Sequence, residues 1–132
     1  MPEFFKKCDL NSLVVSSHDI SDGGLAIALA ESCILSAKGA TIELKKELNR
    51  DDNLLFAEGG ARIIFSVDKM KEKEWLNYLK TNQKQSQSSI YLKKIGYVSA
   101  ETLKIKIQDK NICNIRVEEL TEKFNNSISE YF

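Results

Sequence analysis

A Gly-Gly pair followed by an unbroken apolar run constrains this chain more than any other feature. Ser16 to Ile34 reads SSHDISDGGLAIALAESCI, and each Gly inside a helix costs about 0.5–1 kcal/mol relative to Ala. Two glycines at the start of a helix suggest that a phosphate or a neighbouring chain approaches the backbone there. Leu25 to Ala30 are apolar on every side, which predicts a helix covered on more than one side. We predict this helix over Asp22 to Ala37, ended by Lys38-Gly39.

The residues before this helix read as a strand followed by a loop. Leu13, Val14 and Val15 form a short, mostly β-branched apolar run, which is typical of a strand. Ser21 is a candidate N-cap, because its hydroxyl can accept a hydrogen bond from an orphan N–H of the first helical turn. Asp22 would lie where the helix dipole favours negative charge.

Each polar residue of this loop has a structural interpretation beside a functional one. His18 is the single histidine, and with no cluster of metal ligands around it in sequence it fits a hydrogen-bonded loop residue. Asp19 either braces the loop or binds a metal or ligand. Ser21 and Asp22 either only cap the helix or face a phosphate. Gly23-Gly24 marks either a close packing contact without ligand or a phosphate site.

A second glycine pair marks the other candidate segment, which reads LLFAEGGARIIFSV from Leu54 to Val67. Glu58 precedes the pair and Arg62 follows it, and a strand is predicted from Ile63 to Val67. The segment is either a ligand contact or a bulge or turn that feeds this strand.

The remaining elements follow from alternation and helical spacing, and their mixture predicts an α+β fold (an α/β sandwich) with helices packed on a mixed sheet. A helix between Lys69 and Lys80 would bury its Trp75, Leu76 and Leu79 face. The predicted elements are a strand at Ala40–Leu44, a loop or short helical turn at Lys46–Asn53, that helix capped by Asp68, an exposed loop at Thr81–Ser89, a strand at Ile90–Val98, a hairpin of Leu103–Ile107 and Ile112–Ile115 turning at Asp109-Lys110-Asn111, and a last helix with Glu118 and Glu119 in its first turn and Leu120, Phe124 and Ile128 on one face.

Length and charge narrow the class of protein. The 132 residues suffice for one domain with a core. Basic and acidic residues balance at 19 each, so the sequence carries no electrostatic footprint for nucleic acid or an anionic membrane. No apolar run approaches the roughly 20 residues that a membrane span needs, and the N-terminus lacks the apolar core of a signal peptide. Cys8, Cys33 and Cys113 are odd in number and widely spaced, which fits reduced thiols in a cytoplasmic protein.

Three stretches, in the right order, resemble the C-terminal domain of phosphoribosylformylglycinamidine synthase, the synthetase subunit of purine biosynthesis. The specific one is HDISDGGLAIALAE from His18, and the others are LFAEGGARIIF from Leu55 and IGYV from Ile95 with LKI from Leu103. The last helix also resembles the end of that protein, so the resemblance covers nearly the whole chain. The alternatives are a domain of the related aminoimidazole ribonucleotide synthetase, and a free-standing nucleotide-binding or interaction domain of the same fold. A purely structural domain, whose glycine loop binds nothing, is a third.

The resemblance implies a carbon–nitrogen ligase. The full enzyme would use ATP and Mg²⁺ to convert formylglycinamide ribonucleotide and glutamine-derived ammonia into formylglycinamidine ribonucleotide. This chain would be a single domain, the C-terminal fragment of a longer multidomain enzyme, and inactive alone without the N-terminal ATP-binding domains. A glutaminase subunit or domain would supply the ammonia, and a homodimer stays open.

The resemblance also implies roles for eight residues, none of them catalytic. Those expected to face the nucleotide or substrate phosphate are Ser21, Asp22, Gly23 and Gly24, together with Glu58 and Arg62 from the segment that matches a substrate-contacting stretch. Asp19 would contact magnesium, and His18 would support the loop.

Overall fold

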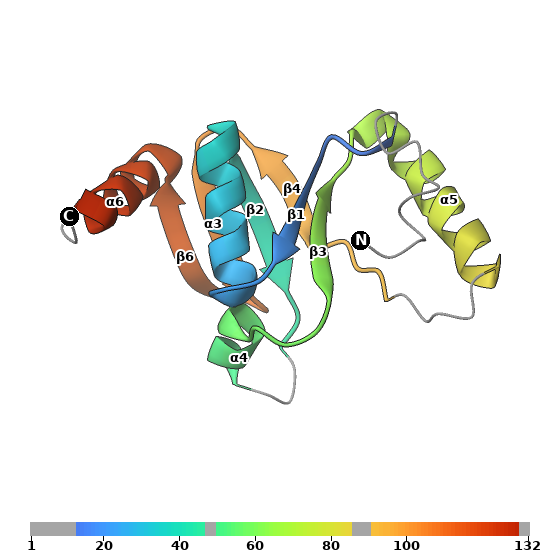
Figure 1. Ribbon diagram of the computed structural model, residues 1–132, viewed down its shortest axis with the longest axis horizontal. Helices are drawn as coiled ribbons and strands as arrows, with labels where there is room; N and C mark the ends of the chain where they lie inside the picture. Colours follow the sequence, from blue (N-terminus) through green and yellow to red (C-terminus); the bar gives the residue numbers. More distant parts are fainter. Residues whose placement is uncertain (1–12, 47–49, 86–90, 130–132) are drawn as a thin grey trace. The chain divides into compact units, whose positions relative to one another are not determined.

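The computed structural model describes residues 13–46, 50–85 and 91–129 (Figure 1). These residues fall into two units with separate internal contacts. Among them, one unit takes residues 13–17, 64–85 and 91–94, and the other takes residues 18–46, 50–63 and 95–129. The predictions for residues 1–12, which include Cys8, lie outside the described residues.

The larger unit is built on a four-stranded mixed sheet, which confirms the predicted fold class. The strand order is β4 (Gly96–Ser99), β2 (Gly39–Leu44), β5 (Thr102–Ile107) and β6 (Lys110–Arg116). Strand β2 pairs with β5 in parallel and with β4 antiparallel, and β5 and β6 form the predicted hairpin.

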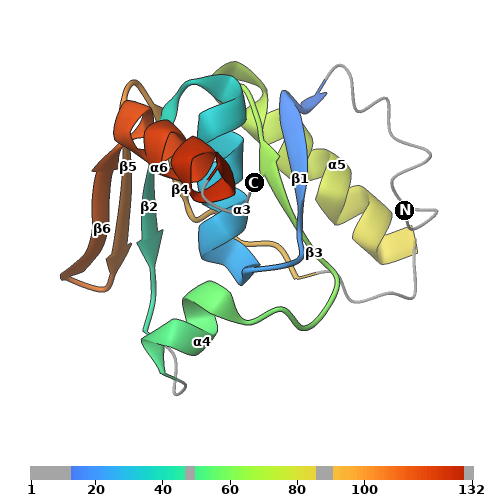
Figure 2. The same ribbon diagram turned by 60° about the vertical axis from the view of Figure 1, so that its left-hand side comes forward.

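Alternation along the central strands decides which face of this sheet is covered. Ile42 pairs with Ile105, and both side chains are buried. Their neighbours Glu43 and Lys106 pair on the opposite face, where both are exposed. Helices α3 (Gly24–Ser36) and α6 (Val117–Ser129) contact each other and strands β2 and β6 on the covered side (Figure 2). The short helix α4 (Asp51–Phe56) contacts α3.

Helix α3 confirms the main prediction and corrects its ends. It begins two residues after Asp22, and it is covered by the sheet, α4 and α6, so the apolar sequence meets more than one neighbour. Its C-cap is Ala37 in a left-handed conformation (φ 53°), not Gly39. Gly39 instead begins β2, and an added Cβ there would clash with the Thr102 backbone, which explains the glycine.

The smaller unit has its own core. The 3-10 turn η1 (Lys69–Lys71) leads into helix α5 (Glu72–Gln85), and the Asp68 carboxylate accepts a 2.8 Å hydrogen bond from Met70 N, as its predicted capping role requires. Trp75 and Leu79 are buried with Leu13, and the Trp75 ring lies 5.4 Å from that of Phe65. The predicted core face of this helix is confirmed at Trp75 and Leu79, whereas Leu76 is half-buried.

Two strand predictions are wrong in extent. The strand expected at Leu13–Val15 is displaced to β1 (Ser16–Ile20), which pairs with β3 (Arg62–Ser66). Leu13 is buried in the core of the smaller unit, and Val15 N donates to Ser66 O just before β1 begins. The strand expected at Ile90–Val98 is only β4, whose pairing with β2 starts at Gly96.

Two loops and the last helix also differ from the predicted elements. Helix α5 continues to Gln85, so the loop expected from Thr81 is wrong over those residues, while 86–90 lie outside the described residues. The hairpin turns at Gln108 and Asp109, so the turn begins one residue earlier than expected, and β6 already begins at Lys110; Gln108 lies in the left-handed region. In α6 the expected stripe is only half-buried at Leu120 and exposed at Phe124, and the side chain of Ile128 is not described.

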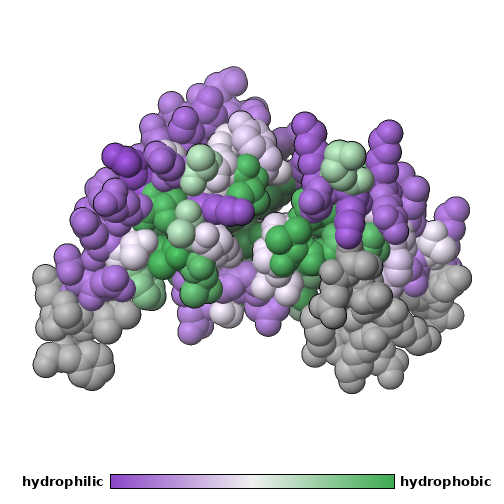
Figure 3. Space-filling model, turned by 90° about the horizontal axis from the view of Figure 1, so that it is seen from above, coloured by the Kyte–Doolittle hydropathy of each residue, from purple (hydrophilic) through white to green (hydrophobic). Residues whose placement is uncertain are grey.

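Apolar side chains reach the surface among hydrophilic ones (Figure 3). They include Leu35, which is 81% exposed near the end of α3, and Phe124 on α6. Within the described ranges no helix is long and apolar enough to cross a membrane.

Candidate functional site

The two glycine-bearing segments meet at the N-terminus of α3. The N-cap of this helix is Gly23, in a left-handed conformation with φ 80°, and its backbone N–H donates a 2.9 Å hydrogen bond to the Glu58 carboxylate. Ser21 is therefore not the side-chain cap that its position predicts: its carbonyl accepts from Gly24 N instead. Asp22 precedes the N-cap, so the first turn of α3 contains no acidic residue.

Gly24 is required by packing. An added Cβ at this position would lie 2.6 Å from the carbonyl carbon of Phe56 and 2.7 Å from its Cα, closer than real side chains approach. The backbone φ of 68° adds a second reason for glycine. This close contact is the packing alternative that the sequence left open for the pair.

The second segment is held by its own arginine. The Arg62 guanidinium donates from Nη2 to the carbonyl oxygen of Ala57, across the loop that carries the second glycine pair. The Arg62 Nε is buried without a hydrogen-bond partner. Gly59 and Gly60 are both exposed, and an added Cβ would meet nothing within 4 Å at either. This loop connects residue Phe56 to strand β3, which is the structural alternative that the sequence left open.

His18 and Asp19 lie on strand β1 rather than in a loop. His18 Nε2 lies 2.9 Å from Glu31 Oε2 on α3, with side chains that are 28% and 41% exposed. This pair links β1 to α3. Asp19 is exposed. Throughout residues 13–46, 50–85 and 91–129, no three His, Cys, Asp or Glu side chains come together in a way that could hold a metal ion.

Sequence reasoning missed Glu31 and the backbone oxygen of Ala57. Glu31 is the single charged residue of α3, and a lone acid in an apolar helix is a usable signal for a polar partner. The Ala57 carbonyl gave no such signal, because every residue carries that group.

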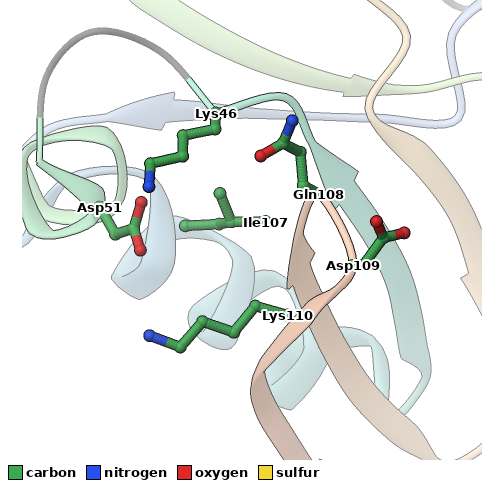
Figure 4. A pocket seen from close by; sticks show the side chains of 6 residues that line it. All are labelled: Lys46, Asp51, Ile107, Gln108, Asp109 and Lys110. Atoms are coloured by element: carbon green, nitrogen blue, oxygen red, sulfur yellow. The ribbon is translucent and has the colours of Figure 1, made fainter.

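A shallow hollow lies away from these residues (Figure 4). It has a volume of about 240 Å³, and Lys46 and Asp51 extend toward one another across it while Asp109 points away. None of the predicted site residues lines it. Its mixed charges and openness to solvent give no reason to place the predicted ligand there.

The two described cysteines are free thiols in the larger unit. Burial raises the pKa of the Cys33 thiol, and the nearby Cys113 adds to this effect. Burial also raises the pKa of the Cys113 thiol. Both groups are therefore poor nucleophiles near neutral pH, because the thiolate is the reactive form.

Together, the mixed sheet with one helical layer and the glycine loop at the N-terminus of its central helix define an α+β domain with a loop-built candidate ligand site. The chain belongs to the family described as "AIR synthase related protein, C-terminal domain", which matches residues 2–108.

Two relatives carry the same name. Over 129 residues the chain is 80% identical to "Phosphoribosylformylglycinamidine synthase subunit PurL" of Prochlorococcus marinus (strain MIT 9301), covering 98% of this chain and 17% of the relative. The protein of the same name from Trichormus variabilis is 34% identical over 119 residues, covering 88% of this chain and 15% of the relative. The chain thus spans about a sixth of the length of these relatives.

Solved structures share the fold. Thermotoga maritima PurL complexed with ATP matches with a TM-score of 0.72 at 17% identity, covering 90% of this chain and 20% of that chain. The structure of PurLQS from the same organism matches with a TM-score of 0.72 at 16% identity, again covering 90% and 20%.

Proposed function

We propose that this chain is the C-terminal domain of a phosphoribosylformylglycinamidine synthase subunit. The observation that carries the proposal is the 80% identity over 129 residues to a PurL subunit. The order of the three motifs and the AIR synthase-related fold support it. The chain would be one domain of a longer polypeptide and inactive alone.

The proposed reaction is the ATP-dependent amidation of formylglycinamide ribonucleotide to formylglycinamidine ribonucleotide. ATP would activate the amide oxygen as a leaving group, which ammonia then displaces, releasing phosphate and ADP. Nucleotide use is supported by relatives of the same fold whose structures are named as complexes with ATP and ADP.

The contribution of this domain would come from the backbone at the start of α3. The amides of Gly23 and Gly24 already donate to the Glu58 carboxylate and to the Ser21 carbonyl. A phosphate would therefore face the later amides of the first turn, beside the exposed Ser21 and Asp22, where the helix N-terminus favours negative charge. Asp19 would supply one carboxylate to magnesium. A single carboxylate fits, because Mg²⁺ in nucleotide sites commonly takes one or two carboxylates together with phosphate oxygens and water.

The proposed partners are the other domains of the same polypeptide and an ammonia source. The N-terminal ATP-binding domains would complete the nucleotide site. A glutaminase subunit or domain would deliver ammonia, in keeping with the PurLQS assembly named among the structural relatives. We place the enzyme in the cytoplasm, and a homodimer is one assembly that size measurements on the full polypeptide would test.

Domain replacement tests this proposal. The chain would replace the matching 129 residues of the Prochlorococcus PurL in the full-length subunit, here called the chimera. The chimera should restore growth without purines to a strain that lacks this synthase, to the level of the parent PurL. Failure of a soluble, expressed chimera to restore growth, while the parent does, would overturn the proposal.

A further inference from the structure

We propose that Glu58 is a positioning residue: its carboxylate holds the amide of Gly23 and so fixes the first turn of α3, and it does not itself contact the ligand. The inference rests on the proposed function for the meaning of that turn. It reassigns a residue that sequence resemblance placed among the ligand contacts.

The Glu58 carboxylate already accepts a hydrogen bond from the start of α3. Glu58 Oε1 accepts the Gly23 N–H at 2.9 Å, and this N–H belongs to the N-cap of a 13-residue helix. A carboxylate at a helix N-terminus gains from the helix dipole as well as from the hydrogen bond. Gly23 has no side-chain cap of its own, so Glu58 supplies from a distant segment what Ser21 fails to supply locally.

The backbone around Glu58 is itself held by contacts of the neighbouring residues. Arg62 donates to the carbonyl of Ala57, the residue just before Glu58. On the other side of the contact, the backbone of Gly24 lies so close to the backbone of Phe56 that no side chain would fit between them. Contacts of neighbouring residues thus hold the backbone on both sides of the Glu58–Gly23 hydrogen bond. The bond therefore joins two segments whose positions are already fixed.

The charge of the Glu58 side chain distinguishes a positioning role from a contact with the ligand. A hydrogen bond to the Gly23 amide needs an acceptor oxygen at the end of a side chain of this length, and Gln provides one without charge. A direct contact with a metal ion, or with a positively charged donor, depends on the negative charge. Glu58→Gln therefore preserves a positioning role and removes a charged contact, while Glu58→Ala removes both.

The experiment compares these variants in the full-length chimera. Glu122→Ala, which removes an exposed carboxylate on α6, serves as the matched control. We would measure kcat and KM for the ribonucleotide and for ATP. In the same preparations, amide hydrogen exchange would be followed in the peptide that contains Gly23.

If Glu58 positions the loop, Glu58→Gln keeps kcat/KM within about threefold and keeps Gly23 protected. Glu58→Ala should then lower kcat/KM at least about tenfold and speed exchange at Gly23, since a hydrogen bond to a charged group is lost. Glu122→Ala should change neither.

Equal loss in Glu58→Gln and Glu58→Ala, with exchange at Gly23 unchanged in both, would make Glu58 a ligand contact and overturn the proposal. Unchanged activity and unchanged exchange in Glu58→Ala would also overturn it. If Glu58→Ala fails to fold, Glu58→Gln still decides between the two roles. An unmodified chimera without activity would instead count against the proposed function, and exchange at Gly23 would then test the positioning contact by itself.

Discussion

The backbone amide of Gly23 donates to the carboxylate of Glu58 at 2.9 Å, and this bond joins residues 35 positions apart in the sequence. The two glycine-bearing segments, which are far apart in the sequence, therefore meet at the start of α3. A change in the second segment is expected to act on the first.

Gly24→Ala should strongly destabilise the larger unit, whereas Gly59→Ala should not. At Gly24 the new methyl group meets the Phe56 backbone at 2.6 Å and the φ of 68° is unfavourable, so we expect a loss of at least about 2 kcal/mol. At Gly59 the methyl group meets nothing within 4 Å, and a lower entropy of the unfolded chain gives a change between zero and a gain of about 1 kcal/mol. Urea denaturation followed by circular dichroism measures both, and equal losses would contradict the packing explanation.

Leu103→Ala should cost about 2–5 kcal/mol of unfolding free energy, because the side chain is 2% exposed in the middle of the four-stranded sheet. Leu35→Ala is the matched control. This leucine is 81% exposed near the end of α3, and its removal should change the stability by no more than about 0.5 kcal/mol. A comparable loss at Leu35 would mean that another part of the chain or a partner covers that side chain in solution.

Cys33 and Cys113 should react slowly with alkylating reagents at pH 8. Their pKa values are raised by burial, so the thiolate fraction at a given pH is smaller than for a free cysteine and rises only at higher pH. Cys33 is the more buried of the two and should react last. Labelling at several pH values, with each site resolved by peptide mass spectrometry, measures this order. In denaturant the two should react alike, and rapid labelling of Cys33 in the folded chain would contradict its burial.

The chain alone should bind neither Mg-ATP nor ADP in isothermal titration. In the proposed enzyme the N-terminal ATP-binding domains complete the nucleotide site, and in this chain the Gly23 amide is already bonded to Glu58. The chimera, with the remaining domains present, should bind nucleotide. Micromolar binding by the isolated, folded chain would favour a free-standing nucleotide-binding domain instead.

The sequence predicted the elements whose patterns are local. Alternation located β2 and the β5–β6 hairpin, and the capping acid at Asp68 located the start of η1. It failed where tertiary contacts decide. Val15 reads as part of a strand together with Leu13, yet Leu13 belongs to a core with Trp75, and the strand forms from polar residues that follow.

The candidate site was predicted as a set of residues but not as an arrangement. Glycine and small polar residues marked the two segments, because glycine is costly in regular structure unless the backbone requires it. The partners within the site were not predictable, since the cap of Gly23 comes from Glu58 and not from the nearby Ser21. Ser21 has the right chemistry for a cap, but the left-handed turn at Gly23 moves the N-cap beyond it.

Substrate-dependent ADP release by the purified chimera tests the proposed function most directly. With ATP, magnesium and ammonia present, we predict that ADP forms only when formylglycinamide ribonucleotide is added, in equal amount to the amidine product and at a rate close to that of the parent PurL. A folded chimera that releases no ADP on addition of this substrate, under conditions where the parent does, would contradict the assignment of this chain to the synthase.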